Sequence, residues 1–268
     1  MPEKSTKPVI AVSGGGQGIG RGILLYFAER GYDVAIVDVD QDQMAVTAAD
    51  CEALGAEVLA LVCDVTQSNQ VDAAYAQLAE HYGRLDVQVN NAGILRRQRI
   101  MDSTDEVTQA VIGVNVFGVI HTSRAAMRIM VPQGSGNIIT AHSLLGDRMP
   151  DAGLGVYSAT KAFVASLTRV MAAECAPYGI RVNGYAPSVT DSAMVHHIIE
   201  ERPVAKLDQI SMREFGRPEQ VGKICWFLCS DLAEYTTGAS IPTDGGSWLV
   251  QRPFLPWEAA GKIEPRQR

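Results

Sequence analysis

The stretch Ser13-Gly14-Gly15-Gly16-Gln17-Gly18-Ile19-Gly20 decides how this chain is expected to fold. It follows a short β-branched run at residues 9–12 and opens an amphipathic segment at residues 18–30, which predicts a strand, a tight turn and a helix. Glycines let the backbone approach a ligand closely, and the N–H groups at a helix start attract phosphate. The spacing is G-x-x-x-G-x-G rather than G-x-G-x-x-G, and the turn is predicted to bind a diphosphate.

The same alternation of strand and helix continues outward from this turn. Further strands are predicted at residues 33–38, 57–63, 85–90, 137–141, 180–185 and 240–243. Helices are predicted at residues 42–54, 68–82, 105–130, 156–176 and 218–230. Alternating strands and helices imply parallel strands joined by right-handed crossovers, with helices on both faces. We therefore expect one doubly wound α/β domain over residues 1–268, a Rossmann-type fold with a parallel sheet of about seven strands.

Two stretches interrupt this rhythm. Residues 188–216 are polar and only partly periodic, and we interpret them as a substrate lid. Residues 247–268 form a tail that is expected either to fray or to reach toward a neighbouring subunit.

Composition excludes several classes of protein. The 268 residues carry a formal net charge of −7, which argues against a nucleic-acid-binding face. No apolar run is expected to reach the roughly 18 residues of a membrane span, and the first residues lack the apolar core of a signal peptide. The five cysteines include no C-x-x-C pair, so neither a disulfide framework nor a zinc site is indicated. We expect a cytoplasmic protein without a metal.

Asp38 ends the predicted second strand. A carboxylate about 20 residues after such a turn can accept hydrogen bonds from the adenosine ribose hydroxyls and would repel a 2′-phosphate. Residues that usually bind a 2′-phosphate are missing. Gln17, and not Arg or Lys, precedes Gly18, and Val39 follows Asp38. The alternative is a solvated carboxylate at a strand end. The pattern favours NAD over NADP as cofactor.

Tyr157 and Lys161 lie four residues apart in a helical segment, so they share one face of a helix. A nearby ammonium favours the phenolate, and the pKa of Tyr157 is therefore expected to fall from about 10 toward the working range of a general acid or base. The alternative is an amphipathic surface pair.

Several motifs together resemble the short-chain dehydrogenase/reductase family. They are the glycine turn, Asp64-Val65, Asn90-Asn91-Ala92-Gly93, Asn115, Ser143, Tyr157 with Lys161, Asn183 with Pro187, Gly216-Arg217-Pro218-Glu219 and Asp244-Gly245-Gly246. They occur in family order from residue 9 to about 246, roughly nine-tenths of the chain.

The resemblance implies a role for each matching residue. Tyr157 would be the general acid/base, Lys161 would lower its pKa and hold the nicotinamide ribose, and Ser143 would bind the reacting oxygen. Asn115 would hold a water that relays protons from Lys161. The implied cofactor contacts are Gly14, Gln17, Gly18, Ile19, Gly20, Asp38, Asp64, Val65, Asn91, Gly93, Tyr157, Lys161, Pro187 and Thr190. The implied substrate contacts are Ser143, Leu145 and Tyr157.

Some positions depart from the family pattern or stay open. After Pro187, Ser188, Thr190 and Ser192 stand where the family usually has other residues, so the loop is expected to be less free, although the backbone at Thr190 should still bind the carboxamide. His142 stands where a small polar residue is usual, and it either points into the pocket or packs beneath it. Arg96, Arg97 and Arg99 are either surface residues or an anion site. The adjacent pair His196-His197 lacks the spacing of a metal site.

We expect an NAD-dependent oxidoreductase that interconverts a secondary alcohol and its ketone, with a polyol, vicinal diol or sugar as substrate and a homotetramer as assembly. One alternative is a reductase of 3-oxoacyl thioesters, which normally prefers NADP(H), and Asp38 argues against it. Another alternative is a non-catalytic dinucleotide-binding sensor, which would need no proton-transfer residues. The substrate, its stereochemistry and the favoured direction stay open.

Overall fold

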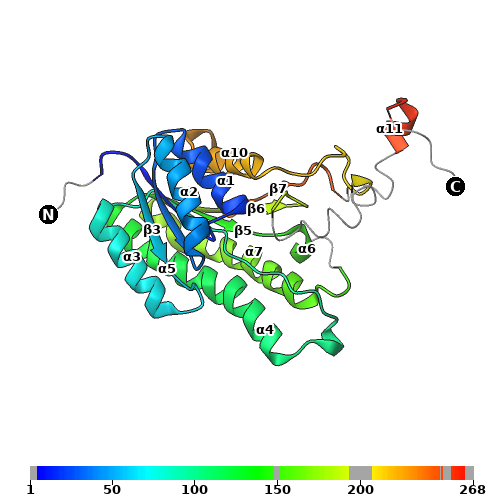
Figure 1. The fold of residues 1–268 in the computed structure, drawn as a ribbon, viewed down its shortest axis with the longest axis horizontal. Helices are drawn as coiled ribbons and strands as arrows, with labels where there is room; N and C mark the ends of the chain where they lie inside the picture. Colours follow the sequence, from blue (N-terminus) through cyan, green and yellow to red (C-terminus); the bar gives the residue numbers. More distant parts are fainter. Residues whose placement is uncertain (1–4, 148–150, 193–206, 248, 250–254, 263–268) are drawn as a thin grey trace.

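The computed structural model describes residues 5–147, 151–192, 207–247, 249 and 255–262 (Figure 1). Seven parallel strands form one sheet in the order β3-β2-β1-β4-β5-β6-β7. The strands are β1 (Val9–Ser13), β2 (Asp33–Asp38), β3 (Val58–Val62), β4 (Val87–Asn90), β5 (Gly136–Ala141), β6 (Ile180–Pro187) and β7 (Ser240–Thr243). This confirms the predicted α/β fold with its parallel sheet.

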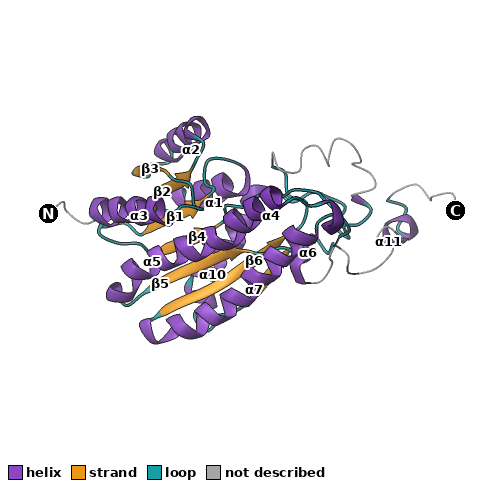
Figure 2. Ribbon diagram, turned by 90° about the horizontal axis from the view of Figure 1, so that it is seen from below, coloured by secondary structure: helices purple, strands orange, loops and turns teal. Residues whose placement is uncertain are grey.

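Helices cover both faces of the sheet (Figure 2). The longer ones are α1 (Gly18–Ala28), α2 (Gln41–Ala53), α3 (Ser68–Tyr82), α4 (Asp105–Ile112), α5 (Val119–Gln133), α7 (Gly155–Cys175) and α10 (Pro218–Cys229). Two short helices, α6 (Leu144–Asp147) and α11 (Leu255–Ala259), were not predicted from the sequence. Neither has the length that a periodic apolar pattern needs to become visible.

The apolar residues of the inner strands are shared between two hydrophobic cores, one on each face of the sheet. In β1, Val9 and Ala11 pack with α3, α5 and α7, whereas Ile10 and Val12 pack with α1, α2 and α10. Side chains on a strand point alternately to opposite faces, and a strand buried on both faces is therefore apolar throughout. This explains why the predicted strands are continuous apolar runs.

The predicted helix at residues 105–130 is longer and less regular than expected. α4 and α5 are joined by a π-helical turn, Gly113–Gly118, into one helix from Asp105 to Gln133. The most apolar 18-residue window of this 29-residue helix has a mean hydropathy of 1.2, so the expectation that no segment could span a membrane by length and composition is wrong. The most apolar part is 44% buried inside the domain, and the core helix of a globular protein passes the same test.

The chain reverses its direction of strand addition between β1 and β4. From β1 the order runs outward through β2 and β3 on one side and through β4 to β7 on the other. In such sheets ligands bind outside the carboxyl ends of the strands, at this switch point. The glycine turn follows β1 and Asn91 follows β4, and both therefore lie at the place where a ligand is expected.

Candidate active site

The glycine turn is shaped by close contacts that only glycine permits. Gly14 has a φ of 67° and Gly18 a φ of 55°, a region that other residues rarely adopt. A Cβ on Gly20 would overlap the carbonyl oxygen of Gly14, so α1 begins directly against the turn. The backbone N–H of Gly14 donates to Val37 at 2.8 Å, which ties the turn to β2.

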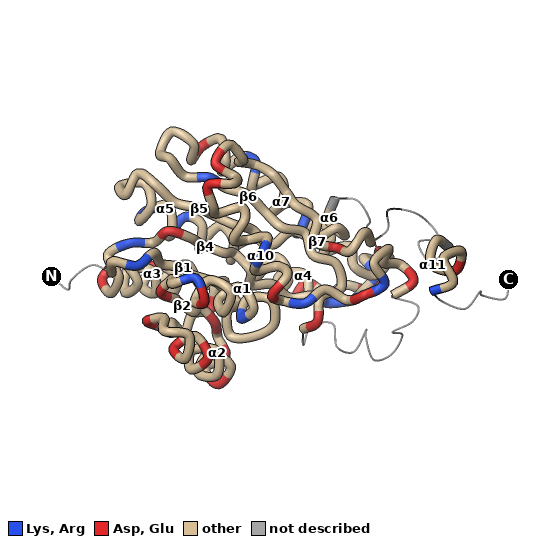
Figure 3. The backbone as a smooth tube through the Cα atoms, turned by 90° about the horizontal axis from the view of Figure 1, so that it is seen from above, with Lys and Arg blue, Asp and Glu red and all other residues tan. Residues whose placement is uncertain are grey.

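Asp38 closes the turn from the end of β2. Its carboxylate accepts hydrogen bonds from the N–H of Gly16 at 2.9 Å and from the N–H of Val39 at 2.7 Å. A carboxylate has about four acceptor sites, so capacity for ribose hydroxyls remains. The neighbouring α2 carries Asp42, Asp50 and Glu52 and no Lys or Arg (Figure 3). This end of the site is therefore acidic.

A cleft of about 1050 Å³ runs from Asp38 to Tyr157. Most residues named from the sequence line it: Gly14, Gln17, Gly18, Ile19, Asp38, Asp64, Val65, Asn91, Gly93, Ser143, Leu145, Tyr157, Lys161, Pro187 and Thr190. Gly20 and Asn115 do not line the cleft.

Asn91 links the glycine turn to the far side of the cleft. Its Nδ2 donates to the carbonyl oxygen of Gly14 at 2.9 Å, and its Oδ1 accepts from the hydroxyl of Tyr185 at 2.9 Å. Three strand ends, those of β1, β4 and β6, are thereby held together. Tyr185 could not be identified as a site residue from the sequence, because an aromatic residue within a strand is ordinary.

Asn115 lies in the π-helical turn, fully buried. Its Oδ1 accepts from the N–H of Ile94 at 2.8 Å, and its Nδ2 donates to the carbonyl of Ile94 at 3.0 Å and to the Thr160 hydroxyl at 3.1 Å. A Cβ on Gly93 would lie 3.4 Å from Asn115 Oδ1 and 3.5 Å from Lys161 Nζ. Gly93 thus sits between the two side chains.

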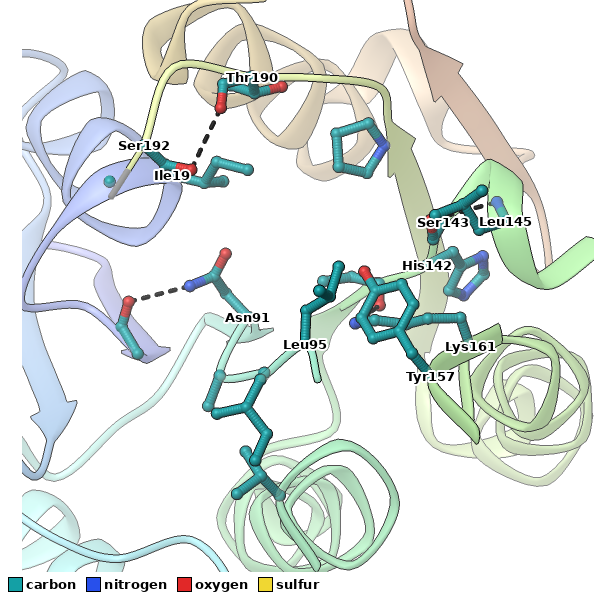
Figure 4. A pocket seen from close by; sticks show the side chains of 18 of the residues that line it. Ile19, Asn91, Leu95, His142, Ser143, Leu145, Tyr157, Lys161, Thr190 and Ser192 are labelled. Carbon is teal, nitrogen blue, oxygen red and sulfur yellow. Dashed lines mark hydrogen bonds between the residues drawn. The ribbon is translucent and has the colours of Figure 1, made fainter. Parts of the chain in front are cut away.

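Tyr157, Lys161 and Ser143 converge on one wall of the cleft. Figure 4 shows Tyr157 and Lys161 side by side at the start of α7, with Ser143 on the neighbouring end of β5. Ser143 lies close enough to Tyr157 to lower the pKa of the phenol. Lys161 Nζ donates to the carbonyl of Ala141 at 2.9 Å, and it lies 5.8 Å from the centre of the Tyr157 ring.

The pKa of Tyr157 shifts in the direction opposite to the one expected from the sequence. Burial raises the pKa of Tyr157 above its ordinary value of 10.0, and the nearby Ser143 offsets this only in part. Burial lowers the pKa of Lys161 to about 8. The expected lowering of the tyrosine pKa by lysine is therefore wrong for this arrangement, because desolvation of the phenolate dominates.

His142 is buried beneath the site, where both ring nitrogens are close to hydroxyl groups, and the residue also lines the cleft (Figure 4). The ring is 4% exposed, with Nδ1 2.7 Å from the Ser240 hydroxyl and Nε2 2.9 Å from the Thr168 hydroxyl. A Cβ on Gly184 would overlap the imidazole, so β6 leaves room for it. Burial first, and then the charges of Lys161 and Arg169, lower the pKa of His142 to about 4.

The three arginines after Gly93 are separated by the structure. Arg96 and Arg97 line the cleft, whereas Arg99 is absent from its wall and forms an ion pair with Asp102. Arg97 pairs with Asp151 at 3.1 Å.

The segment predicted to be a substrate lid, residues 188–216, is described in part. Pro187 ends β6, and Thr190 is buried and pairs with Gly216 in an isolated β-bridge. Gln209, Ile210 and Ser247 add cleft contacts that the sequence did not indicate, since nothing in a loop sequence fixes which side faces a ligand. His196 and His197 lie outside the described residues. Over the described ranges, no group of His, Cys, Asp or Glu could hold a metal ion.

The tail is also described only in part. The indole N–H of Trp257 donates to the carbonyl of Ser211 at 2.8 Å, so α11 contacts the end of the lid within the same chain. Whether the tail also contacts a neighbouring subunit stays a prediction.

Comparisons with known proteins place the chain among oxidoreductases. A family model described as enoyl-(acyl carrier protein) reductase matches residues 14–247. The chain is 34% identical over 238 residues to a 3-oxoacyl-(acyl-carrier-protein) reductase of Thermotoga maritima, covering 89% of this chain and 96% of the relative. It is also 34% identical over 256 residues to a cyclohexanol dehydrogenase of Rhodococcus sp., covering 89% and 95%.

Two solved structures share the fold at high similarity. An NAD⁺-bound xylitol dehydrogenase matches with a TM-score of 0.85 and 27% identity, covering 89% of this chain and 98% of that one. A 3-ketoacyl-(acyl-carrier-protein) reductase of Brucella melitensis complexed with NADH matches with a TM-score of 0.83 and 30% identity, covering 91% and 100%.

Proposed function

Because this chain belongs to the short-chain dehydrogenase/reductase family, we propose that it is an NAD-dependent oxidoreductase that interconverts a secondary alcohol and its ketone. One observation carries the proposal: Tyr157, Ser143 and Lys161 converge at one end of a cleft whose other end is formed by the glycine turn and Asp38. A polyol, vicinal diol or sugar is the proposed substrate class.

The residues present fit a nicotinamide dinucleotide. The contact between Gly20 and Gly14 leaves a cradle that any larger side chain would disrupt, and the start of α1 offers N–H groups to a diphosphate. Asp38 would accept the adenosine ribose hydroxyls, and its charge, beside the acidic α2, disfavours a 2′-phosphate. When bound, the nicotinamide supplies or accepts the hydride.

The chain's own residues would hold and move the proton. In the reductive direction Tyr157 donates its hydroxyl proton to the carbonyl oxygen, while Ser143 donates a hydrogen bond to the same oxygen. The raised pKa of Tyr157 keeps the phenol protonated at neutral pH, as this role requires. In the oxidative direction the phenolate accepts the proton of the alcohol.

Lys161 and Asn115 support that transfer. With a pKa of about 8, Lys161 can exchange a proton near neutral pH. Asn115 fixes the backbone of Ile94 through two hydrogen bonds and so positions Gly93 next to Lys161. We propose that a water held near Asn115 completes the path to solvent.

The names of two similar proteins support an alcohol substrate. One relative is a cyclohexanol dehydrogenase, and one structural neighbour is an NAD⁺-bound xylitol dehydrogenase. The fully assembled set of proton-transfer residues argues against a non-catalytic sensor, since a sensor needs no general acid.

A second candidate is a reductase of 3-oxoacyl thioesters, which the similarity to the Thermotoga maritima relative favours. Cofactor choice alone does not separate the candidates, because the Brucella melitensis 3-ketoacyl reductase was crystallised with NADH. The substrate assay therefore has to include a 3-oxoacyl thioester.

The test is a spectrophotometric assay at the absorbance of NADH. Polyols, vicinal diols and sugars are supplied with NAD or NADP, and a 3-oxoacyl thioester is supplied with NADH or NADPH. We expect alcohol oxidation with NAD, and a loss of about 100-fold or more in kcat for Tyr157→Phe. Equal turnover by Tyr157→Phe, or activity confined to the thioester, would contradict the proposal.

We also propose a cytoplasmic homotetramer. Phe117, Phe163 and Val170, on the long helices, are each about half exposed, which suits a helix-to-helix interface between subunits. Light scattering should give a mass of roughly four times 28.8 kDa, and a monomeric mass at micromolar concentration would refute the assembly.

A further inference from the structure

The substrate end of the cleft carries a rim that the reaction itself does not need. Residues 96–98 run beside residues 151–154, the segment that leads into α7. An isolated bridge pairs Gln98 with Leu154, and the N–H of Gln98 donates to the carbonyl of Gly153 at 2.7 Å. Leu154 is buried and lies three residues before Tyr157. The rim is therefore attached to the helix that carries the general acid.

The two arginines of this rim differ in their partners. Arg97 is neutralised, since its guanidinium contacts the carboxylate of Asp151 at 3.1 Å and the carbonyl of Ala152 at 3.3 Å. Arg96 is exposed, and it donates to the carbonyl of its own neighbour Leu95 at 3.0 Å. In the described part of the chain, no carboxylate lies within ion-pair distance of Arg96.

The remaining charges of the cleft do not compensate Arg96. Its described carboxylates are Asp38, Asp64 and Asp151. Asp38 ends β2 and Asp64 follows β3, at the end of the cleft proposed for the adenosine. Asp151 forms an ion pair with Arg97. The substrate end therefore presents one uncompensated guanidinium at its mouth.

The wall between this cation and Tyr157 is apolar. Leu95, Leu144, Leu145, Leu154 and Ile210 are among the residues that line the cleft. Such a wall suits a short hydrocarbon segment. One guanidinium fork balances one negative charge and matches a carboxylate in geometry.

We infer that Arg96 binds the carboxylate of the substrate, which is therefore a secondary hydroxy acid, or the corresponding oxo acid in the reverse direction. The inference rests on the proposed oxidation of a secondary alcohol, and as the substrate it puts a hydroxy acid in place of a neutral polyol, diol or sugar. In the oxidation, the carbinol C–H bond breaks with transfer of hydride to NAD⁺, the O–H proton passes to Tyr157, and the C=O bond forms. The carboxylate stays intact and serves only to anchor the molecule.

The test compares matched acid and ester substrates. Straight-chain hydroxy acids from 3-hydroxybutyrate to 3-hydroxyoctanoate and their methyl esters are assayed with NAD, using wild type, Arg96→Gln and Arg99→Gln. Arg99 is the matched control, because it lies in the same segment, is exposed and is absent from the cleft wall. The measured quantity is the ratio of kcat/KM for acid over ester.

We expect wild type to favour the acid, and Arg96→Gln to lower the ratio by about 10- to 100-fold, as expected for the loss of a charge-assisted hydrogen bond. The loss should appear in KM for the acid, and Arg99→Gln should keep the wild-type ratio. Turnover of esters or neutral polyols with the same ratio in wild type and Arg96→Gln overturns the anion site and leaves the oxidoreductase intact. A lack of NAD reduction with every alcohol overturns the proposed function itself.

Discussion

Protonation of His142 should destabilise the fold in a defined pH range. The ring is buried among the hydroxyls of Thr140, Thr168 and Ser240, and its pKa is lowered from 6.5 to about 4. Between these values the unfolded chain binds a proton that the native state does not. Stability is therefore complete above about pH 6.5, falls as the pH drops toward 4, and changes no further below 4 on account of this group.

The magnitude follows from the shift. A change in the pKa of His142 from 6.5 to about 4 lowers the free energy of unfolding by about 3 kcal/mol once the ring is fully protonated in both states. About 2.5 kcal/mol of this is lost by pH 4.5. The side chain is 4% exposed, so solvent screening reduces this little.

The assay is urea unfolding at pH 7.5, 6.5, 5.5 and 4.5 at one protein concentration, for wild type and His142→Gln. Glutamine removes the titration while keeping a polar side chain, and all other ionisable groups are common to both proteins. The variant should be less stable at pH 7.5, because hydroxyl partners are lost, but should show a smaller decline on acidification. Equal declines in the two proteins between pH 6.5 and 4.5 would refute the reasoning.

Three further predictions concern the cleft. Asp38→Asn should lower the preference for NAD over NADP, measured as the ratio of kcat/KM, by about 10-fold, because the repulsion of a 2′-phosphate is removed. Gly20→Ala should raise the Kd for NADH by about 10-fold or more, measured by fluorescence titration, because the new Cβ displaces Gly14. The control is Gly113→Ala, whose Cβ would lie 3.4 Å from Thr66, and it should bind NADH like wild type. Because burial raises the pKa of Tyr157, the rate of alcohol oxidation should climb with pH above neutrality while ketone reduction does not, and a flat oxidation profile would count against Tyr157 as the base.

The sequence predicted the regular part of the fold well. Every observed strand begins and ends within two residues of its predicted bounds, and β7 coincides with the predicted 240–243. Strands buried on both faces are apolar throughout, and glycine marks a turn at positive φ; both signals are local. Residues at the carboxyl ends of those strands could therefore be assigned to one cleft before the structure was known.

The structure supplied what depends on contacts between distant segments. The π-helical turn at Asn115 has no periodic signal in the sequence, yet it directs the side chain toward the backbone of Ile94. The sequence leaves the orientation of the His142 side chain open, because its partners Thr168 and Ser240 come from the distant elements α7 and β7. Likewise, the spacing of Tyr157 and Lys161 predicts their proximity, but only burial determines the direction of the tyrosine pKa shift.

Buried hydrogen bonds of Asn91, Lys161 and His142 both stabilise the fold and position segments of the site. The bond of Asn91 to Gly14 ties the end of β4 to the end of β1. The bond of Lys161 to Ala141 ties α7 to the end of β5, and the bond of His142 to Ser240 ties the residue after β5 to the start of β7. A buried polar group left without a partner costs about 1–3 kcal/mol, whereas a satisfied bond adds less. Each of these bonds therefore favours one arrangement of the segments that it joins, and protonation of His142 would disturb the bonds that hold the residue next to Ser143.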